Sequence, residues 1–87
     1  MTSNLKIAFK EAFKKISETN KPLPPDVLLR LYAYNKQATR GDNFPASPRE
    51  INIRDAFKFN AWIQLKGMEE EEAMQEYINL ANEILNQ

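Results

Sequence analysis

Two side chains on one predicted helix could bind a phosphate group together. Tyr32 and Lys36 lie four residues apart in the stretch Tyr-Ala-Tyr-Asn-Lys-Gln-Ala-Thr-Arg-Gly-Asp, which covers positions 32 to 42. Residues at this spacing project from the same side of a helix. A phenol hydroxyl and an ammonium both donate hydrogen bonds, and the ammonium adds positive charge, so the pair suits a bound phosphate. The alternative is an ordinary surface pair, which contributes roughly a few tenths of a kcal/mol.

Lys58 is the second informative residue, because it falls inside an apolar arc. On a helical wheel it lies between Ala61 and Leu65 on one side and Trp62 on the other. Burying an ammonium costs on the order of several kcal/mol unless the group is paired or reaches water. By position alone, the simpler interpretation is a lysine at the rim of the core whose ammonium extends into water.

Four amphipathic helices are predicted to position these side chains. The first spans Leu5 to Ile16, with Phe9 and Phe13 in its apolar arc and Ile7 outside that arc. The second spans positions 25 to 40, after a proline-rich connection that ends one helix and starts the next. Its apolar stripe contains four residues: Val27, Leu31, Tyr34 and Ala38. Tyr32 and Lys36 lie roughly 140° from this stripe and therefore form a separate face.

The second half of the chain contains the longest predicted loop and two further helices. Positions 41 to 51 are rich in turn residues, and Ser47 to Glu50 has the spacing of a capping box around one short helical turn. The third helix is expected from Asn52 to Lys66, where Gly67 ends it. The fourth begins at Glu69 to Glu72, where carboxylates complement the helix dipole, and it carries Tyr77 at the centre of its apolar arc. Strand patterns are absent, so the prediction is an all-helical bundle.

Composition narrows the class of function. Eighty-seven residues make one small domain, and 12 basic residues balance 12 acidic ones. This balance argues against a nucleic-acid binder, which needs a basic excess. There is no cysteine and no histidine, which removes disulfides, thiolate or imidazole metal ligands, and the commonest nucleophile–base pairs. We therefore expect a protein that is not an enzyme and holds no metal or cofactor.

The same composition bears on membranes and on location. The N-terminal residues Met1 to Asn4 are polar and lead directly into a charged amphipathic helix, so no signal peptide is predicted. No apolar run approaches the roughly 20 residues needed to span a bilayer. Net neutrality gives no reason to expect strong membrane attraction. We expect a monomeric cytoplasmic protein without stable membrane insertion.

Three separated segments resemble the acyl-CoA-binding protein family. The stretch from Tyr32 to Asp42 resembles the family signature Tyr-x-x-Tyr-Lys-Gln-Ala-Thr-x-Gly-Asp. The segment Phe57 to Trp62 is similar to a second region with an Ala-Lys-Trp-x-Ala-Trp core, and Ala73 to Ile78 matches Ala-Met-x-x-Tyr-Ile. The resemblance runs from about Leu5 to Leu85, with one or two extra residues in the first connection.

The resemblance implies both a fold and a ligand. The fold would be an antiparallel four-helix bundle of up-down-down-up topology, and the ligand a long-chain acyl-coenzyme A thioester. Tyr32, Lys36 and Lys58 would hold the 3′-phosphate of the adenosine moiety, and Tyr77 would line the site. The acyl chain would lie in an apolar groove, and the protein would act as an acyl-CoA carrier and buffer.

The sequence departs from the family pattern at Asn35, where the family carries a tyrosine that contacts the adenine. Base–aromatic stacking is worth roughly 1–3 kcal/mol in nucleic-acid systems, so the affinity is expected to be about tenfold or more weaker. Two alternatives to the carrier stay open. One is a small helical protein-interaction module, and the other is a degenerate family member that binds coenzyme A weakly.

Overall fold

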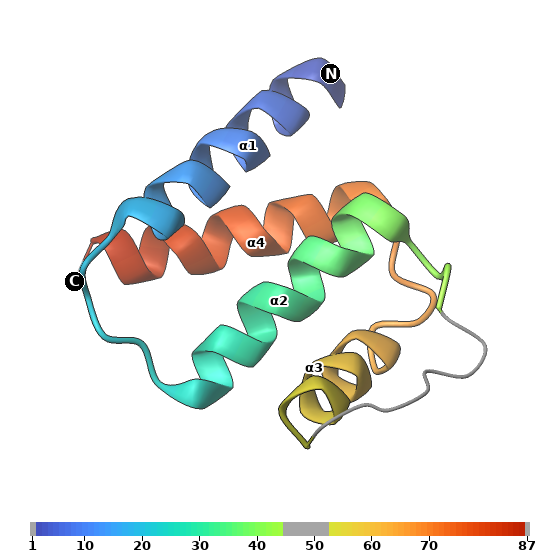
Figure 1. The fold of residues 1–87 in the computed structure, drawn as a ribbon. Coiled ribbons are helices and arrows are strands. Elements are labelled where there is room, and N and C mark those ends of the chain that lie inside the picture. The colour runs from blue at the N-terminus through green and yellow to red at the C-terminus, as the bar shows by residue number, and fades with distance from the viewer. Residues whose placement is uncertain (1, 45–52, 87) are drawn as a thin grey trace.

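The computed structural model describes residues 2–44 and 53–86, and these form four helices and no strand (Figure 1). The helices are α1 (Thr2–Glu18), α2 (Pro25–Arg40), α3 (Ile53–Ile63) and α4 (Glu70–Leu85). In Figure 1, α1 and α4 run in the same direction and α2 runs opposite to both. The predicted all-α four-helix fold is confirmed. No helix in the described ranges has the length and apolar character needed to cross a bilayer.

The helices are packed side by side in an order that differs from their order in the chain. Among the described residues, α1 packs against α4, α4 against α2, and α2 against α3. The molecule is correspondingly flat, with principal extents of 36 × 32 × 16 Å. This order leaves α1 at one edge of the layer and α3 at the other. It also brings the second and third helices, which carry four of the five predicted ligand residues, into direct contact.

Local chemistry sets both ends of α2 where the sequence predicts them. Pro24 is the extended residue before the helix, and Pro25 takes the first helical position, where a missing N–H costs nothing. At the other end, Gly41 has φ 61°, a left-handed value that side chains other than glycine rarely adopt. Its N–H donates to the Gln37 carbonyl at 3.0 Å and completes the last turn. The predicted range of 25 to 40 is confirmed.

The other helix boundaries differ from the predictions. Helix α1 extends beyond the predicted Leu5–Ile16 range at both ends. Helix α3 ends at Ile63 rather than at Lys66, because the chain continues in tighter turns. There the Lys66 N–H donates to the Ile63 carbonyl at 3.0 Å, an i to i−3 bond in place of the α-helical i to i−4 bond. The predicted helix start at Asn52 and the capping box at 47–50 lie outside the described residues.

Most of the core lies along α4, which packs against both α1 and α2. Its buried members are Phe9, Ala12, Leu31, Ala38, Ala73, Met74, Tyr77, Leu80, Ala81 and Ile84. Phe13 belongs to the apolar arc predicted for α1, yet its side chain is 48% exposed. The reason is tertiary: α1 packs against α4 alone among the described residues, so one edge of its apolar arc stays open. Ile7 is 57% exposed, as its place outside the arc predicts.

Candidate ligand-binding site

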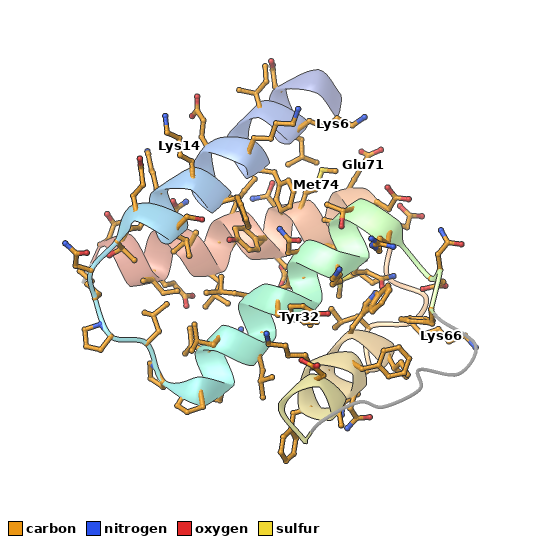
Figure 2. All side chains as sticks on the ribbon, viewed as in Figure 1. Lys6, Lys14, Tyr32, Lys66, Glu71 and Met74 are labelled. Atoms are coloured by element: carbon orange, nitrogen blue, oxygen red, sulfur yellow. The ribbon has the colours of Figure 1, made fainter. Side chains whose placement is uncertain are left out.

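Two lysines from different helices converge on one tyrosine ring. The Lys36 Nζ lies 5.6 Å from the centroid of the Tyr32 ring, and the Lys58 Nζ lies 5.3 Å from the same centroid. Tyr32 and Lys36 come from α2, and Lys58 comes from α3. Tyr32 is on the middle part of α2 (Figure 2). The structure thus brings together three of the five predicted site residues, and it does so through the packing of α2 against α3.

The described residues offer the two ammonium groups in this cluster no acidic partner. Neither Lys36 nor Lys58 forms an ion pair with a carboxylate within the described residues. Both side chains are half-buried, as is Tyr32. Cation–π attraction to a ring contributes only about 0.5–1 kcal/mol at exposed sites, and it does not neutralise the charges. Two neighbouring unneutralised cations beside a phenol form a place where an anion, above all a doubly charged phosphate, would be stabilised.

A buried glutamine connects α2 to α3 directly beside Lys36. The Gln37 side chain is fully buried, and its Nε2 donates to Asp42 Oδ1 at 2.9 Å and to the Met68 carbonyl at 2.7 Å. Its Oε1 accepts a hydrogen bond from Trp62 Nε1 at 3.1 Å. The same indole N–H also lies 3.2 Å from the Gly41 carbonyl. Because Trp62 is one helical turn after Lys58, this network holds the part of α3 that carries the lysine.

Asp42 extends this network to the segment after α3. Its carboxylate accepts the Gly67 backbone N–H at 3.0 Å. Hydrogen bonds from the Gln37 side chain, and then from Gly67, lower the pKa of the Asp42 carboxyl below its usual value of 3.8. The Asp42 carboxyl is therefore ionised at neutral pH, and this ionised form accepts the hydrogen bonds. We call Gln37, Asp42 and Trp62 the α2–α3 clip.

Sequence reasoning did not assign the clip residues to the site. Gln37 and Asp42 entered it only as parts of one motif, and Trp62 as part of an apolar arc and as the last residue of a second motif. A signal was present, because a buried tryptophan usually needs a partner for its indole N–H. Which residue would be that partner could not be deduced, since Gln37 and Trp62 are 25 positions apart. Trp62 also reaches the cation cluster, because the centroid of its ring lies 6.0 Å from the Lys36 Nζ.

The fourth predicted site residue, Tyr77, lies in the core and not beside the lysines. Its side chain is 2% exposed, and its ring packs edge-on against Phe9, with 5.1 Å between the ring centroids. Phe13, which like Phe9 belongs to α1, also lies against the Tyr77 ring, with 6.3 Å between the ring centroids. Burial raises the pKa of the Tyr77 hydroxyl to about 12. The role of Tyr77 as a residue that lines a ligand site stays a prediction.

The fifth predicted residue, Asn35, is half-buried on α2. At 100° per residue it lies about 60° from Tyr32 around the helix, so both belong to one side of it. Leu28, one turn before Tyr32, is also on this side and is 52% exposed. The side of α2 that carries the phenol and the lysine therefore also carries an amide and an uncovered apolar side chain.

A hollow of about 550 Å³ lies elsewhere, at the C-terminal end of α2 and the N-terminal end of α4. Lys6 from α1 lines it, together with the acidic residues from Glu69 to Glu71. It includes none of the five predicted site residues. Across the residues described, no three histidine, cysteine, aspartate or glutamate side chains are grouped so as to hold a metal ion. The hollow gives no support for a metal centre.

Comparison with known proteins gives one consistent family. Residues 6–81 match the family described as acyl CoA binding protein. The acyl-CoA-binding protein of Saccharomyces cerevisiae is 42% identical over 77 residues, which cover 88% of each chain. The acyl-CoA-binding protein homolog of Drosophila melanogaster is 40% identical over 70 residues, which cover 80% of this chain and 81% of the relative. The crystal structure of acyl-CoA-binding protein 2 from Oryza sativa aligns with a TM-score of 0.85 and 32% identity, over 94% of this chain and 91% of the other.

Proposed function

This chain belongs to the acyl-CoA-binding protein family, and from that premise we propose that it binds long-chain acyl-coenzyme A thioesters. In this proposal Tyr32, Lys36 and Lys58 hold the 3′-phosphate of the ligand. The supporting observation is the convergence of two unneutralised ammonium groups on the Tyr32 ring, at 5.6 and 5.3 Å from its centroid. Charge-assisted hydrogen bonds from such a cluster are about twice as strong as neutral ones.

The acyl chain supplies affinity, and the phosphate contacts determine which end of the ligand binds where. Burial of one methylene contributes about 0.8 kcal/mol, so affinity should rise with chain length. Leu28 offers uncovered apolar surface one turn from Tyr32, on the same side of α2. A free fatty acid lacks the nucleotide phosphate and would offer the lysines only a singly charged carboxylate. The site should therefore discriminate strongly against it.

The proposed role is that of a carrier and buffer, with no chemical step. The chain has no cysteine and no histidine from which to build a nucleophile–base pair. Enclosure of the acyl chain would keep it out of membranes, and enclosure of the thioester would limit its hydrolysis. Both effects require binding alone.

Calorimetric titration with palmitoyl-coenzyme A tests this function. We expect saturable heat, and an affinity that increases across a series from coenzyme A through short to long acyl chains. Ligand at 100 times its Kd should add about 2.7 kcal/mol to the free energy of unfolding. Absence of both heat and thermal protection would support the alternative of a protein-interaction module. Equal affinity for coenzyme A and palmitoyl-coenzyme A would instead indicate a site without chain recognition.

Asn35→Tyr is expected to tighten palmitoyl-coenzyme A binding by about tenfold, because it restores an aromatic ring at a position on the Tyr32 side of α2. Titration calorimetry measures the change directly. Asn60→Tyr is the matched control, since Asn60 is exposed and lies on the opposite side of α3 from Lys58. An unchanged affinity in the Asn35 variant would show that this position does not contact the base.

A further inference from the structure

Phe13 is an aromatic side chain that the fold leaves half uncovered. Its ring lies against Tyr77, with 6.3 Å between the ring centroids and 36° between the ring planes, yet 48% of the side chain is exposed. Phe9, one turn earlier on α1, packs edge-on against the same tyrosine and is buried. Tyr77 therefore supports the Phe13 ring from one side, and the uncovered part of the ring can contact a ligand.

The side of α1 that carries Phe13 is turned toward α2. At 100° per residue, Phe13 and Lys6 lie about 20° apart around the helix. Lys6 lines the larger hollow together with Gly41 and Asp42, which directly follow α2. Lys15, on the opposite margin of the contact with α4, lines a smaller hollow whose other described lining residues all belong to α1 and α4. Phe13 thus lies on the margin of α1 that faces α2 across α4.

Phe13, Tyr77 and Asn35 lie at the same level of the helix layer. Helices α1 and α4 run in one direction and α2 runs in the other (Figure 1). Three segments of the chain meet at the larger hollow, through Lys6, Gly41 and Glu70. From there, Phe13 and Tyr77 each lie seven residues further along their helices, about 10 Å, and Asn35 lies six residues back along the chain into α2, about 9 Å.

Asn35 lies on α2 between the cation cluster and the contact with α4. It is about 60° from Tyr32 around the helix and, in the other direction, about 40° from Leu31. Leu31 belongs to the same buried cluster as Tyr77. From the cation cluster, the surface of the protein therefore leads past Asn35 to the level of Tyr77, and from there to the uncovered ring of Phe13.

We propose that Phe13 stacks on the adenine base of the bound acyl-coenzyme A, an inference that rests on the function proposed above. The base is attached to the same ribose as the 3′-phosphate, so it must lie next to the cation cluster of Tyr32, Lys36 and Lys58. The asparagine at position 35 supplies no ring on this side of α2. Every base has a π face that stacks on an aromatic side chain. Phe13 supplies that ring from α1.

Phe57 is the other large aromatic side chain with high exposure among the described residues, at 59%. It belongs to α3 and lies about 100° from Lys58 around that helix. No described ring packs against Phe57, whereas Tyr77 already orients Phe13. A side chain that is oriented before binding loses less conformational freedom when it stacks. The structure therefore favours Phe13 over Phe57 as the stacking residue.

Titration calorimetry of the full chain with palmitoyl-coenzyme A tests the role of Phe13. Phe13→Leu keeps an apolar side chain against Tyr77 but removes the ring, and it should weaken binding by at least about fivefold. Phe13→Tyr keeps the ring and should retain most of the affinity. Ile7→Ala removes exposed apolar surface from another side of α1 and should leave the affinity unchanged. Circular dichroism should show the same helical content in all three variants.

A ligand without the base separates stacking from general packing. The probe is an analogue of palmitoyl-coenzyme A in which hydrogen replaces adenine on the ribose, while the 3′-phosphate and the acyl chain remain. The unmodified protein should bind this analogue no more tightly than Phe13→Leu binds the full ligand. Phe13→Leu should bind the analogue as tightly as the unmodified protein does. Phe57→Leu is the matched control on α3, and it should change the affinities for the two ligands by the same factor.

Nuclear magnetic resonance of the complex gives a direct readout of the contact. We expect nuclear Overhauser effects between the Phe13 ring protons and adenine H2 or H8. Tight binding by the unmodified chain with no loss in Phe13→Leu would overturn the stacking and leave the proposed function in place. A loss in Phe57→Leu that is confined to the full ligand would place the base on α3 and would also overturn the inference. If the unmodified chain failed to bind palmitoyl-coenzyme A at all, the proposed function would fail and this inference with it.

Discussion

Lys36→Ala or Lys58→Ala is expected to weaken palmitoyl-coenzyme A binding by roughly 10- to 100-fold while leaving thermal stability nearly unchanged. A hydrogen bond to a charged group is worth about 1.5–3 kcal/mol, and each variant removes at least one such bond to the phosphate. Neither ammonium forms an ion pair with a carboxylate in the described part of the chain, so its loss breaks no salt bridge of the ligand-free protein. Titration calorimetry and thermal unfolding measure the two quantities separately.

Two controls make this result specific to the 3′-phosphate. Lys66→Ala removes an exposed lysine from the turn after α3 and should leave the affinity unchanged. A palmitoyl thioester of dephospho-coenzyme A lacks the 3′-phosphate, so the unmodified protein should bind it about as weakly as the lysine variants bind the full ligand. Lys36→Ala and Lys58→Ala should bind the dephospho ligand almost as tightly as the unmodified protein binds it. Unaltered binding with a large fall in stability would mean that Lys36 and Lys58 are structural.

Gln37→Leu is expected to lower the free energy of unfolding by about 3 kcal/mol. The leucine fills a similar volume but supplies no polar atom to three groups: the Trp62 indole N–H, the Asp42 carboxylate and the Met68 carbonyl. A buried polar group that loses its partner costs about 1–3 kcal/mol. The total loss of stability is limited because the Trp62 indole N–H keeps its contact to the Gly41 carbonyl and because Asp42 is exposed to water. Urea denaturation at neutral pH measures the change.

Gln64→Leu is the control for this prediction, because Gln64 is an exposed glutamine just after α3. It should change stability by less than about 0.5 kcal/mol. A second variant, Trp62→Phe, keeps an aromatic ring but removes the indole N–H and part of a buried ring system whose centroid lies 6.0 Å from the Lys36 Nζ. It should loosen the α2–α3 clip and reduce the preference for the 3′-phosphate ligand over the dephospho ligand. If Gln37→Leu left stability unchanged, the clip would not be what holds α3 against α2.

The predictions that succeeded rest on interactions within one stretch of chain. The range of α2 followed from Pro25 and Gly41, whose backbone preferences act whatever the rest of the fold does. The exposure of Ile7 followed from helical periodicity alone. The end of α3 was wrong by three residues, because the turns after Ile63 lead to Gly67, whose backbone N–H donates to the Asp42 carboxylate just after α2. Phe13 lies in the apolar arc of α1 but is 48% exposed, because a helical wheel does not show how much of such an arc a neighbouring helix covers.

The sequence by itself determined that Tyr32 and Lys36 share one side of a helix, because residues four apart always do so in an α-helix. Only the tertiary structure decided that Lys58, 26 positions after Tyr32 in the chain, has its ammonium 5.3 Å from the same ring. It likewise decided that a single glutamine connects α2 with Trp62 and Met68. The physical reason is that contacts between helices depend on how several imperfect apolar surfaces pack at once, whereas geometry within a helix depends on the backbone alone.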